Sequence, residues 1–246
     1  MGLKAAGMMP AFLAAKDASA DFMIQSYKEV SFFGQTVYLN TTHVTTIIVM
    51  AFILILALVA RHYVLTGDPD NPNAVQNIVE MLFEFMEGLI VNIMGKHTKK
   101  YQNYIMPILM FICVSNISGA FGLRPPTADF AVTLGTALIS FILIQYAGIK
   151  TSGFGVVTDL FKPMPFLFPI NLIGEIATPI SLSLRLYGNI LAGTVMMGLY
   201  YGLMPWLAKL GIPAALHGYL DFFSGVIQTY VFCMLTMVFI TNKLDS

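Results

Sequence analysis

A single arginine lies in the middle of an apolar segment of the chain. The stretch PISLSLRLYGNILAG runs from Pro179 to Gly193, and Arg185 is its only charged residue. A guanidinium group keeps its proton at physiological pH, and at membrane depth its charge costs at least ~2.5 kcal/mol. Arg185 therefore needs water or a partner of opposite charge, and an intramembrane charge of this kind indicates a functional site.

The residues that share a helical face with Arg185 are small or polar. They recur at steps of three or four residues, which is the spacing of one helix face. The set is Gly174, Thr178, Ser181, Arg185, Asn189 and Ala192. Small side chains let another helix come close. We therefore expect a second helix to pack against this face.

A second polar face follows in the last apolar stretch of the chain. It consists of His217, Asp221, Ser224 and Gln228. An acid, a titratable ring, a hydroxyl and an amide on one face suit the passage of a proton or a hydrated ion. His217 is near the end of its segment, so a role at the membrane interface fits it equally well. Glu175 precedes Arg185 by about 15 Å along a helix axis, and Asp221 precedes Gln228 by about 10 Å.

Other interpretations of these residues are open at the level of sequence. In one of them Arg185 pairs with Glu175 or Asp221 and only locks the helices together. In another the chain is a self-contained transporter that binds an anionic substrate through Arg185, although such folds commonly carry internal repeats and the arginine motif occurs once. An intramembrane enzyme is disfavoured, because the patterns Gly-x-Ser-x-Gly and His-Glu-x-x-His do not occur.

The composition indicates which class of protein carries these residues. Hydrophobic residues make up 57% of the chain and charged residues 11%, which is typical of an integral membrane protein. Thirteen basic and thirteen acidic residues cancel, so nothing suggests a nucleic-acid partner. Cys113 and Cys233 lie in apolar runs and are expected to be buried structural residues. We expect no metal site and no cofactor.

The apolar segments predict an all-α multi-pass membrane protein with five spans. A hydrocarbon core of about 30 Å needs about 20 apolar residues. Residues 44–65 form the first span, 75–94 an amphipathic helix on the membrane surface, and 104–122 and 130–149 a helical hairpin (104–149 in all) broken at the prolines of LRPPTAD. Glu80, Glu84 and Glu87 share the polar face of the surface helix, which either water or a protein partner covers.

The last two apolar stretches, 169–205 and 214–242, are longer than a crossing requires. As helices they would measure about 54 Å and about 43 Å. Fitting them into the bilayer needs either a break in the helix or a tilt of roughly 45° or more, against a typical tilt near 20°. We therefore expect residues 169–242 to form two steeply tilted helices held against another surface. With the earlier spans they complete a single transmembrane domain, 44–246.

Basic residues near the span ends predict the orientation. On one side of the predicted membrane lie Arg61, Lys96, Lys99, Lys100, Lys150, Lys162 and Lys243. On the other side lie Lys28, Arg124 and Lys209. The larger group is expected in the cytoplasm together with the C-terminus, and the N-terminus is expected outside. Residues 1–43 then form an external tail. The segment MGLKAAGMMPAFLAAKDASA also has features of a cleaved signal, but Pro10 breaks its apolar run, which favours a tail.

Two motifs carry a resemblance to a known family. The segments SLSLRLYGNILAG and IQTYVFCMLTMVFI, together with RPPTADFAVTLGTAL, resemble subunit a of the bacterial F-type ATP synthase. The resemblance runs from about Asn40 to the C-terminus, and the arginine followed by Tyr-Gly-Asn is highly specific. It implies a multi-pass protein of the bacterial plasma membrane.

The resemblance also implies a mechanism and a set of partners. The family carries H+ or Na+ through two aqueous half-channels, each of which reaches partway across the membrane, and hands the ions to carboxylates on a rotating ring of c subunits. Arg185 matches the essential arginine, and Asn189 and Gln228 match its polar neighbours. Gly174, Thr178, Ser181 and Ala192 would face the ring, and Glu175, His217, Asp221 and Ser224 would belong to the half-channels. The implied partners are the c-ring, the b subunits of the peripheral stalk, other ATP synthase subunits and membrane lipid, with ATP chemistry on other subunits.

The chain departs from the family pattern at two positions. Many bacterial members have a glutamate nine residues after the arginine, where this chain has Thr194. They often have histidine where this chain has Asp221. We infer that the acid has moved from one helix to its neighbour, so that the outer half-channel keeps a carboxylate.

Overall fold

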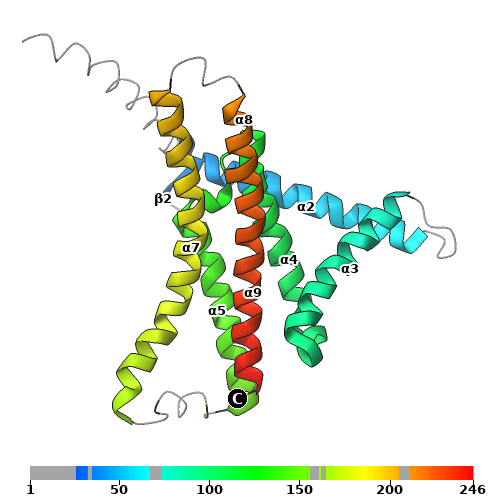
Figure 1. Cartoon of the computed structure of the whole chain (residues 1–246), viewed down its shortest axis with the longest axis vertical. Helices are drawn as coiled ribbons and strands as arrows, with labels where there is room; N and C mark the ends of the chain where they lie inside the picture. The colour runs from blue at the N-terminus through cyan, green and yellow to red at the C-terminus, as the bar shows by residue number, and fades with distance from the viewer. Residues whose placement is uncertain are drawn as a thin grey trace, which may run out of the picture.

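The membrane-spanning part of the chain is entirely helical in a computed structural model (Figure 1). The structure describes residues 26–32, 35–66, 74–153, 155, 161, 165–204 and 211–245. Within them, five helical segments are long and apolar enough to cross a membrane. These segments are Thr41–Tyr63, Ala74–Phe121, Phe130–Ser152, Phe168–Leu203 and Ala215–Asp245. The predicted all-α multi-pass fold with five spans is confirmed.

The first span is helix α2, Thr41–Thr66, which begins three residues before the predicted start. Large apolar side chains are exposed along much of its length, among them Ile47 and Ile55. Figure 1 shows α2 running across the direction of α5, α7 and α9. Helices that cross so steeply cannot all follow the membrane normal. This arrangement supports the prediction that the last two spans are tilted.

The predicted surface helix is α3, Ala74–Met94. A 3-10 turn, Gly95–His97, joins it to α4, Thr98–Ile117, and Gly95 has a positive φ of 48°. Figure 1 shows α3 leaving the direction of α4 at this elbow. Ile78, Met81 and Phe85 are exposed on one side of α3 and Glu84 and Glu87 on another, so the helix is amphipathic. Its placement on the membrane surface stays a prediction.

The break between the second and third spans consists of two short 3-10 segments, Ser118–Phe121 and Pro126–Ala128. Helix α5, Phe130–Ser152, then begins at Asp129, whose side chain accepts a hydrogen bond from the Ala131 amide at 3.0 Å. An acidic N-cap of this kind satisfies one of the free amide groups of the first helical turn. The chain therefore breaks between the two spans around the prolines, as the sequence predicted, although α4 itself already ends at Ile117 and Gly122 follows with a positive φ of 74°.

The two arms of the predicted hairpin are connected largely through a later helix. One direct link joins them, the hydrogen bond of 2.9 Å between Tyr104 Oη and Ser140 Oγ. Helix α9, Ser224–Asp245, packs against both α4 and α5, and α5 also packs against α7. The fully buried core includes Ile105, Ile112, Leu186, Phe232, Cys233, Met237 and Ile240. Cys113 is half-buried, and both cysteines are free, as expected for structural residues.

The two long helices differ in regularity. Helix α7, Phe168–Leu203, is continuous over 36 residues and passes through Pro179 without interruption. The last stretch, for which the sequence left a tilt or a break open, consists of α8, Ile212–His217, a π-helical segment, Gly218–Phe223, and then α9. π-Helical turns are rare and are frequent at functional sites. Asp221 lies inside this one.

Helices α4 and α9 approach each other closely where Asn116 of α4 faces Gly225 of α9. The Asn116 side chain is fully buried and donates to the Gly225 carbonyl oxygen at 3.0 Å. A Cβ atom added at Gly225 would lie 3.0 Å from the Asn116 Cβ and 3.6 Å from its carbonyl carbon. Small residues at helix contacts serve this purpose in membrane proteins.

Replacing Gly225 with alanine is therefore expected to weaken the fold. The added methyl group forces α4 and α9 apart, and overpacking of this kind costs about 1–3 kcal/mol. The measurement is the thermal unfolding midpoint of the solubilised complex. Gly135→Ala in α5 is the matched control, because a Cβ there meets no atom within 4 Å. Equal midpoints for the two variants would contradict the close approach.

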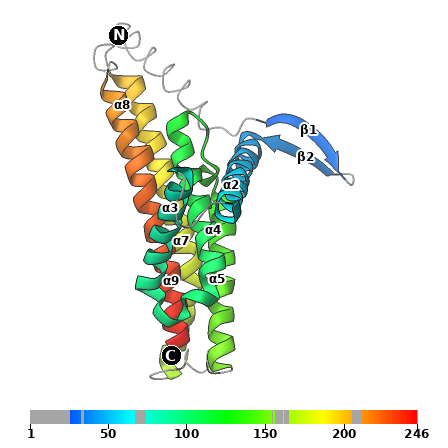
Figure 2. The ribbon, with the colours of Figure 1, turned by 90° about the vertical axis from the view of Figure 1, so that its right-hand side faces the viewer.

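A β-hairpin precedes the membrane helices and was not predicted. Strands β1, Ser26–Phe32, and β2, Gln35–Asn40, pair antiparallel. Figure 2 shows the hairpin projecting from the helices beside the start of α2. The sequence predicted only an external tail for residues 1–43, and within it residues 26–32 and 35–40 form this hairpin, whose regular cross-strand pairing satisfies their backbone groups. The signal-like segment 1–20 lies outside the described residues.

Candidate functional site

Arg185 projects from the middle of α7 and is exposed. Within the described residues it makes no recorded ion pair or hydrogen bond. The interpretation of Arg185 as an internal structural lock required Glu175 or Asp221 as its partner. Each of those acids is bonded elsewhere, as described below. The guanidinium is thus presented outward from the described part of the chain.

The small and polar face of α7 is open around Arg185. Gly174, Ser181 and Ala192 are exposed, and Thr178 is half-buried with its hydroxyl donating to the Gly174 carbonyl at 3.1 Å. A Cβ atom added at Gly174 would meet no atom within 4 Å. Another helix can therefore approach the predicted face at these positions and at Arg185, whereas Asn189 is part-buried against α9.

Two amides lie close to the level of Arg185. The Ser224 hydroxyl of α9 donates to Asn189 Oδ1 of α7 at 2.8 Å. Helices α7 and α9 run antiparallel (Figure 1). Arg185, four residues before Asn189, therefore lies at about the same height in the bundle as Gln228, four residues after Ser224. Among the described residues, Asn189 Nδ2 and Gln228 Nε2 are buried donors with no partner.

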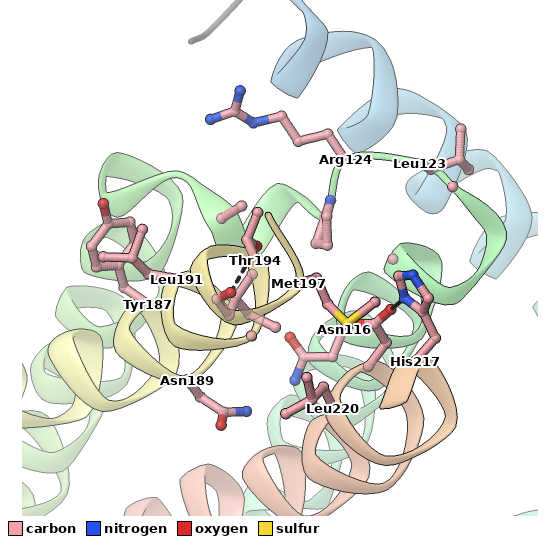
Figure 3. A pocket seen from close by; sticks show the side chains of 17 residues that line it. Asn116, Leu123, Arg124, Tyr187, Asn189, Leu191, Thr194, Met197, His217 and Leu220 are labelled. Carbon is pink, nitrogen blue, oxygen red and sulfur yellow. Dashed lines mark hydrogen bonds and ion pairs between the residues drawn. The ribbon is translucent and has the colours of Figure 1, made fainter. Parts of the chain in front are cut away.

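A cavity of about 530 Å³ lies between α7, the α4–α5 connection and the α8–α9 segment (Figure 3). It stands at the end of the bundle where α7 finishes and α8 begins. Polar side chains from separate elements line it, namely Asn116, Asn189, Thr194, His217 and Asp221. Arg124 from the connection also lines it. The cavity thus brings together Asn189, Thr194, His217 and Asp221, which the sequence analysis considered for the site, with Asn116 and Arg124, which it did not place there.

Asp221 and His217 form a pair on the cavity wall. His217 Nδ1 and Asp221 Oδ2 are 2.6 Å apart, and His217 Nε2 is 3.4 Å from the Tyr201 hydroxyl. The sequence left two roles open for His217: a relay in the ion path, or a residue at the membrane interface. Its contact with the cavity acid places it in the same polar group. Both residues are part-buried and line the cavity.

Thr194 and Asp221 line the same cavity, from α7 and from the π-helical segment. The Thr194 hydroxyl donates to the Ile190 carbonyl at 2.8 Å, so it bonds within its own helix. Gly119 of the connection lies next to the acid, because a Cβ atom there would be in ordinary contact with Asp221 Cγ at 3.8 Å. A carboxylate at position 194 or at position 221 would therefore enter the same cavity.

Asn116 is the polar residue of the site that sequence reasoning missed. Its amide nitrogen donates to the Gly225 carbonyl and to Thr229 Oγ1 at 3.2 Å, and its carbonyl accepts from Thr127 Oγ1 at 2.8 Å. It thereby joins α4, the α4–α5 connection and α9 at the cavity. An amide inside a predicted span was the signal that could have identified it.

Glu175 lies at the opposite end of the bundle from the cavity. Gln145 Nε2 donates to Glu175 Oε2 at 2.7 Å, and Lys243 Nζ donates to Glu175 Oε1. These partners come from α5 and from the last turn of α9, and sequence reasoning predicted neither. The two predicted acids, Glu175 on α7 and Asp221 on the π-helical segment, therefore lie toward opposite ends of the bundle, with Arg185 at a level between them.

The described residues hold no group of three His, Cys, Asp or Glu side chains placed to bind a metal. The chemistry that the arrangement supports comes from a fixed cation, two amide nitrogens without a partner among the described residues, and an acid–histidine pair that lines a cavity. Such groups bind and pass small cations or protons at membrane depth.

Comparison with known proteins gives a consistent result. The chain is 41% identical over 192 residues to the sodium ion specific ATP synthase subunit a of Propionigenium modestum, covering 71% of this chain and 65% of that protein, slightly less than two thirds. It is 36% identical over 232 residues to ATP synthase subunit a of Priestia megaterium, covering 88% and 96%. The family described as "ATP synthase A chain" matches residues 43–241. The chain therefore belongs to the family of ATP synthase A chains, the a subunits of bacterial ATP synthases, and is a multi-pass membrane protein.

Proposed function

We propose that the chain carries H+ or Na+ across the membrane through two offset half-channels and couples that flow to rotation of a ring of c subunits. ATP is made or hydrolysed on other subunits of the complex, so this chain is its ion-conducting part and not its catalyst. The observation that carries the proposal is the position of the cavity relative to Arg185.

The cavity is the outer half-channel. On α7 its lining reaches back to Tyr187 but does not include Arg185, which precedes Tyr187 by two residues, or about 3 Å along the helix axis. A water-filled path that stops at this level reaches only partway across the bilayer. Asp221 and His217 take up the ion from this space, and Asn189, Ser224 and Gln228 lead toward the level of Arg185.

The second half-channel begins at the other end of α7, where Glu175 lies. The wall of this half-channel includes the ring and is completed only in the complex. The basic residues support the sides assigned to the two ends. Lys96 and Lys243 lie at the end of Glu175, because Lys96 bonds to Asp245, while Arg124 lines the cavity at the opposite end. The Glu175 end and the C-terminus then face the cytoplasm of a bacterial plasma membrane, and the N-terminus faces outward.

Arg185 separates the two half-channels. A ring carboxylate that has released its ion is negatively charged, and burial of that charge in an apolar interface is costly without a partner. The outward guanidinium supplies the partner, and Asn189 Nδ2 and Gln228 Nε2 offer further donors beside it. A permanent cation at this place also repels an ion that would pass directly between the half-channels. Rotation is then the only route.

The proposed partners follow from the exposed surfaces. The face of Gly174, Thr178, Ser181 and Ala192 meets the c-ring, which also holds α7 and α9 at their tilt. The apolar side of α2 contacts lipid and the b subunits of the peripheral stalk, and other ATP synthase subunits complete the complex.

Cysteine cross-linking in the assembled complex tests this assignment. In a variant with Cys113 and Cys233 replaced by alanine, Ser181→Cys and Ala192→Cys are each expected to cross-link to a cysteine in the outer helix of the c subunit. The reason is that both positions are exposed on the face that we assign to the ring.

The matched control is Ile142→Cys on the exposed side of α5. It is expected to give no product with the c subunit under the same oxidant. Cross-linking from position 142 in place of positions 181 and 192 would mean that the ring lies against another surface of the chain.

A further inference from the structure

The last turn of α9 binds the N-terminal part of α7 through Glu175. Lys243 of α9 and Gln145 of α5 each bond to a different oxygen of the Glu175 carboxylate. We call these three residues the Glu175 clamp. It joins three helices at the end of the bundle away from the cavity, and neither acceptor oxygen of Glu175 lacks a partner.

The clamp is partly shielded from water. The side chains of Lys243 and Glu175 are each 24% exposed. Removing one member of a shielded ion pair leaves an uncompensated charge, which costs far more than the loss of an exposed pair. The clamp is therefore a strong tie compared with ion pairs on the surface.

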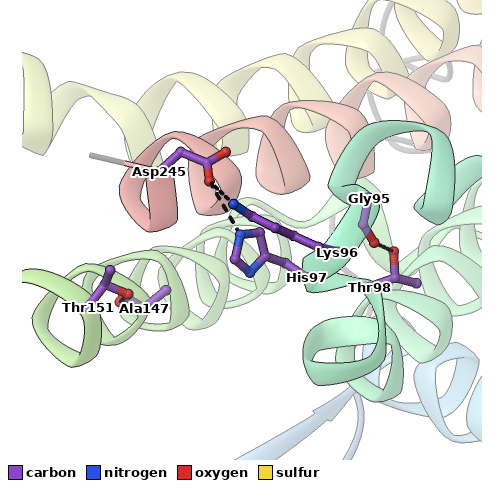
Figure 4. A network of polar contacts seen from close by, with 7 residues as sticks. All are labelled: Gly95, Lys96, His97, Thr98, Ala147, Thr151 and Asp245. Carbon is purple, nitrogen blue, oxygen red and sulfur yellow. Dashed lines mark hydrogen bonds and ion pairs between the residues drawn. The ribbon is translucent and has the colours of Figure 1, made fainter.

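A neighbouring ion pair provides the contrast. Lys96 Nζ and His97 Nε2 contact Asp245 Oδ1 at 3.2 Å and 3.4 Å, so the C-terminal turn of α9 also touches the α3–α4 elbow (Figure 4). The Lys96 side chain is 75% exposed. Ion pairs that are exposed in this way contribute little to stability.

The part of α7 that the clamp holds has few apolar anchors of its own. The buried residues of α7 begin at Pro179, and Ile170, Ile173 and Ile176 before it are exposed. Figure 1 shows the N-terminal end of α7 leaning away from α9. Packing thus fixes the later part of α7, and the clamp is a polar tie on the part that precedes Arg185.

We propose that Glu175 is a positioning residue whose clamp with Lys243 and Gln145 sets the angle at which α7 leaves the bundle, and thereby how closely the face of Arg185 meets the ring. This inference rests on the proposed rotary function. It assigns Glu175 a role in holding α7, distinct from that of a carboxylate that passes ions. Loss of the clamp widens the gap between α7 and the ring, so ions leak between the half-channels.

The test compares Lys243→Met, Glu175→Gln and the exchanged pair E175K/K243E in the assembled complex. Two quantities are measured in inverted vesicles: ATP-driven pumping per assembled complex, and passive ion permeability after the catalytic sector is removed. Each single variant is expected to lower pumping by at least about threefold and to raise permeability. The exchanged pair is expected to restore both, because it rebuilds the ion pair.

The controls separate the possible outcomes. Lys96→Met removes the exposed pair at the same end and is expected to pump normally. If E175K/K243E stays as impaired as the single variants, a carboxylate at position 175 passes ions and the clamp proposal is wrong. Normal pumping by both single variants overturns it as well. Arg185→Ala in the same membranes tests the rotary function separately. If this variant pumps normally, the proposed rotary function is wrong, whatever the clamp variants show.

Discussion

ATP-driven ion pumping in inverted vesicles is expected to fall by roughly fiftyfold or more when Arg185 is replaced with alanine, while the complex stays assembled. The variant leaves an ionised ring carboxylate without its counter-ion. At ~2.5 kcal/mol or more for an uncompensated charge at membrane depth, the ionised state becomes about 60 times less populated. Assembly is preserved because Arg185 makes no recorded bond within the described chain.

Two further variants sharpen this result. Arg185→Lys keeps a charge but lacks the planar fork and can lose its proton when buried, so we expect it to recover only a small part of the pumping. Arg61→Ala, which removes an exposed arginine from the end of α2, is the matched control and is expected to pump normally. Normal pumping by Arg185→Ala would refute the central role of this residue.

A partial loss of pumping, roughly three- to tenfold, is expected for Asp221→Asn. Among the described residues that line the cavity, Asp221 is the one carboxylate. The amide keeps the shape of the side chain but cannot take up a proton or bind a cation as strongly. His217 remains and keeps some uptake, which is why the loss is partial. The measurement is the initial rate of ATP-driven pumping at matched assembly.

The position of the acid can be exchanged to test the same point. Thr194 lines the cavity from α7, so a carboxylate there enters the same space. The double variant T194E/D221N is expected to pump faster than Asp221→Asn alone. Glu87→Gln on α3, an exposed acid remote from the cavity residues, is the control for loss of one negative charge. If Asp221→Asn pumps as fast as the wild type, Asp221 is not part of the ion path.

The sequence predicted the spans well because apolar length is a local property. Helix α5 was expected at 130–149 and runs from Phe130 to Ser152, and α7 was expected from residue 169 and begins at Phe168. The face of Arg185 followed from the helical repeat in the same way. Both depend only on spacing along one helix.

Contacts between segments far apart in the chain could not be predicted from the sequence. The bonds of Glu175 to Lys243 and Gln145 join residues 68 and 30 positions apart, and those of Asn116 to Thr229 span 113. Such pairs are set by how helices pack, which spacing within one helix does not reveal. Recognition of the family motif at Arg185 supplied the role of the arginine, but it did not supply these partners.

The π-helical segment Gly218–Phe223 has a consequence for how the two halves of the last span are oriented. Each residue of an α-helix advances the side chains by about 100° around the axis, and a π-helical turn holds extra chain. The segment therefore acts as a rotational offset: it directs Asp221 and His217 into the cavity while Ser224 and Gly225 keep their contacts with α7 and α4. A one-residue deletion here would swing the acid about 100° away from the water without disturbing the helix beyond it. Chain length in this short segment, as well as residue type, determines which way the acid faces.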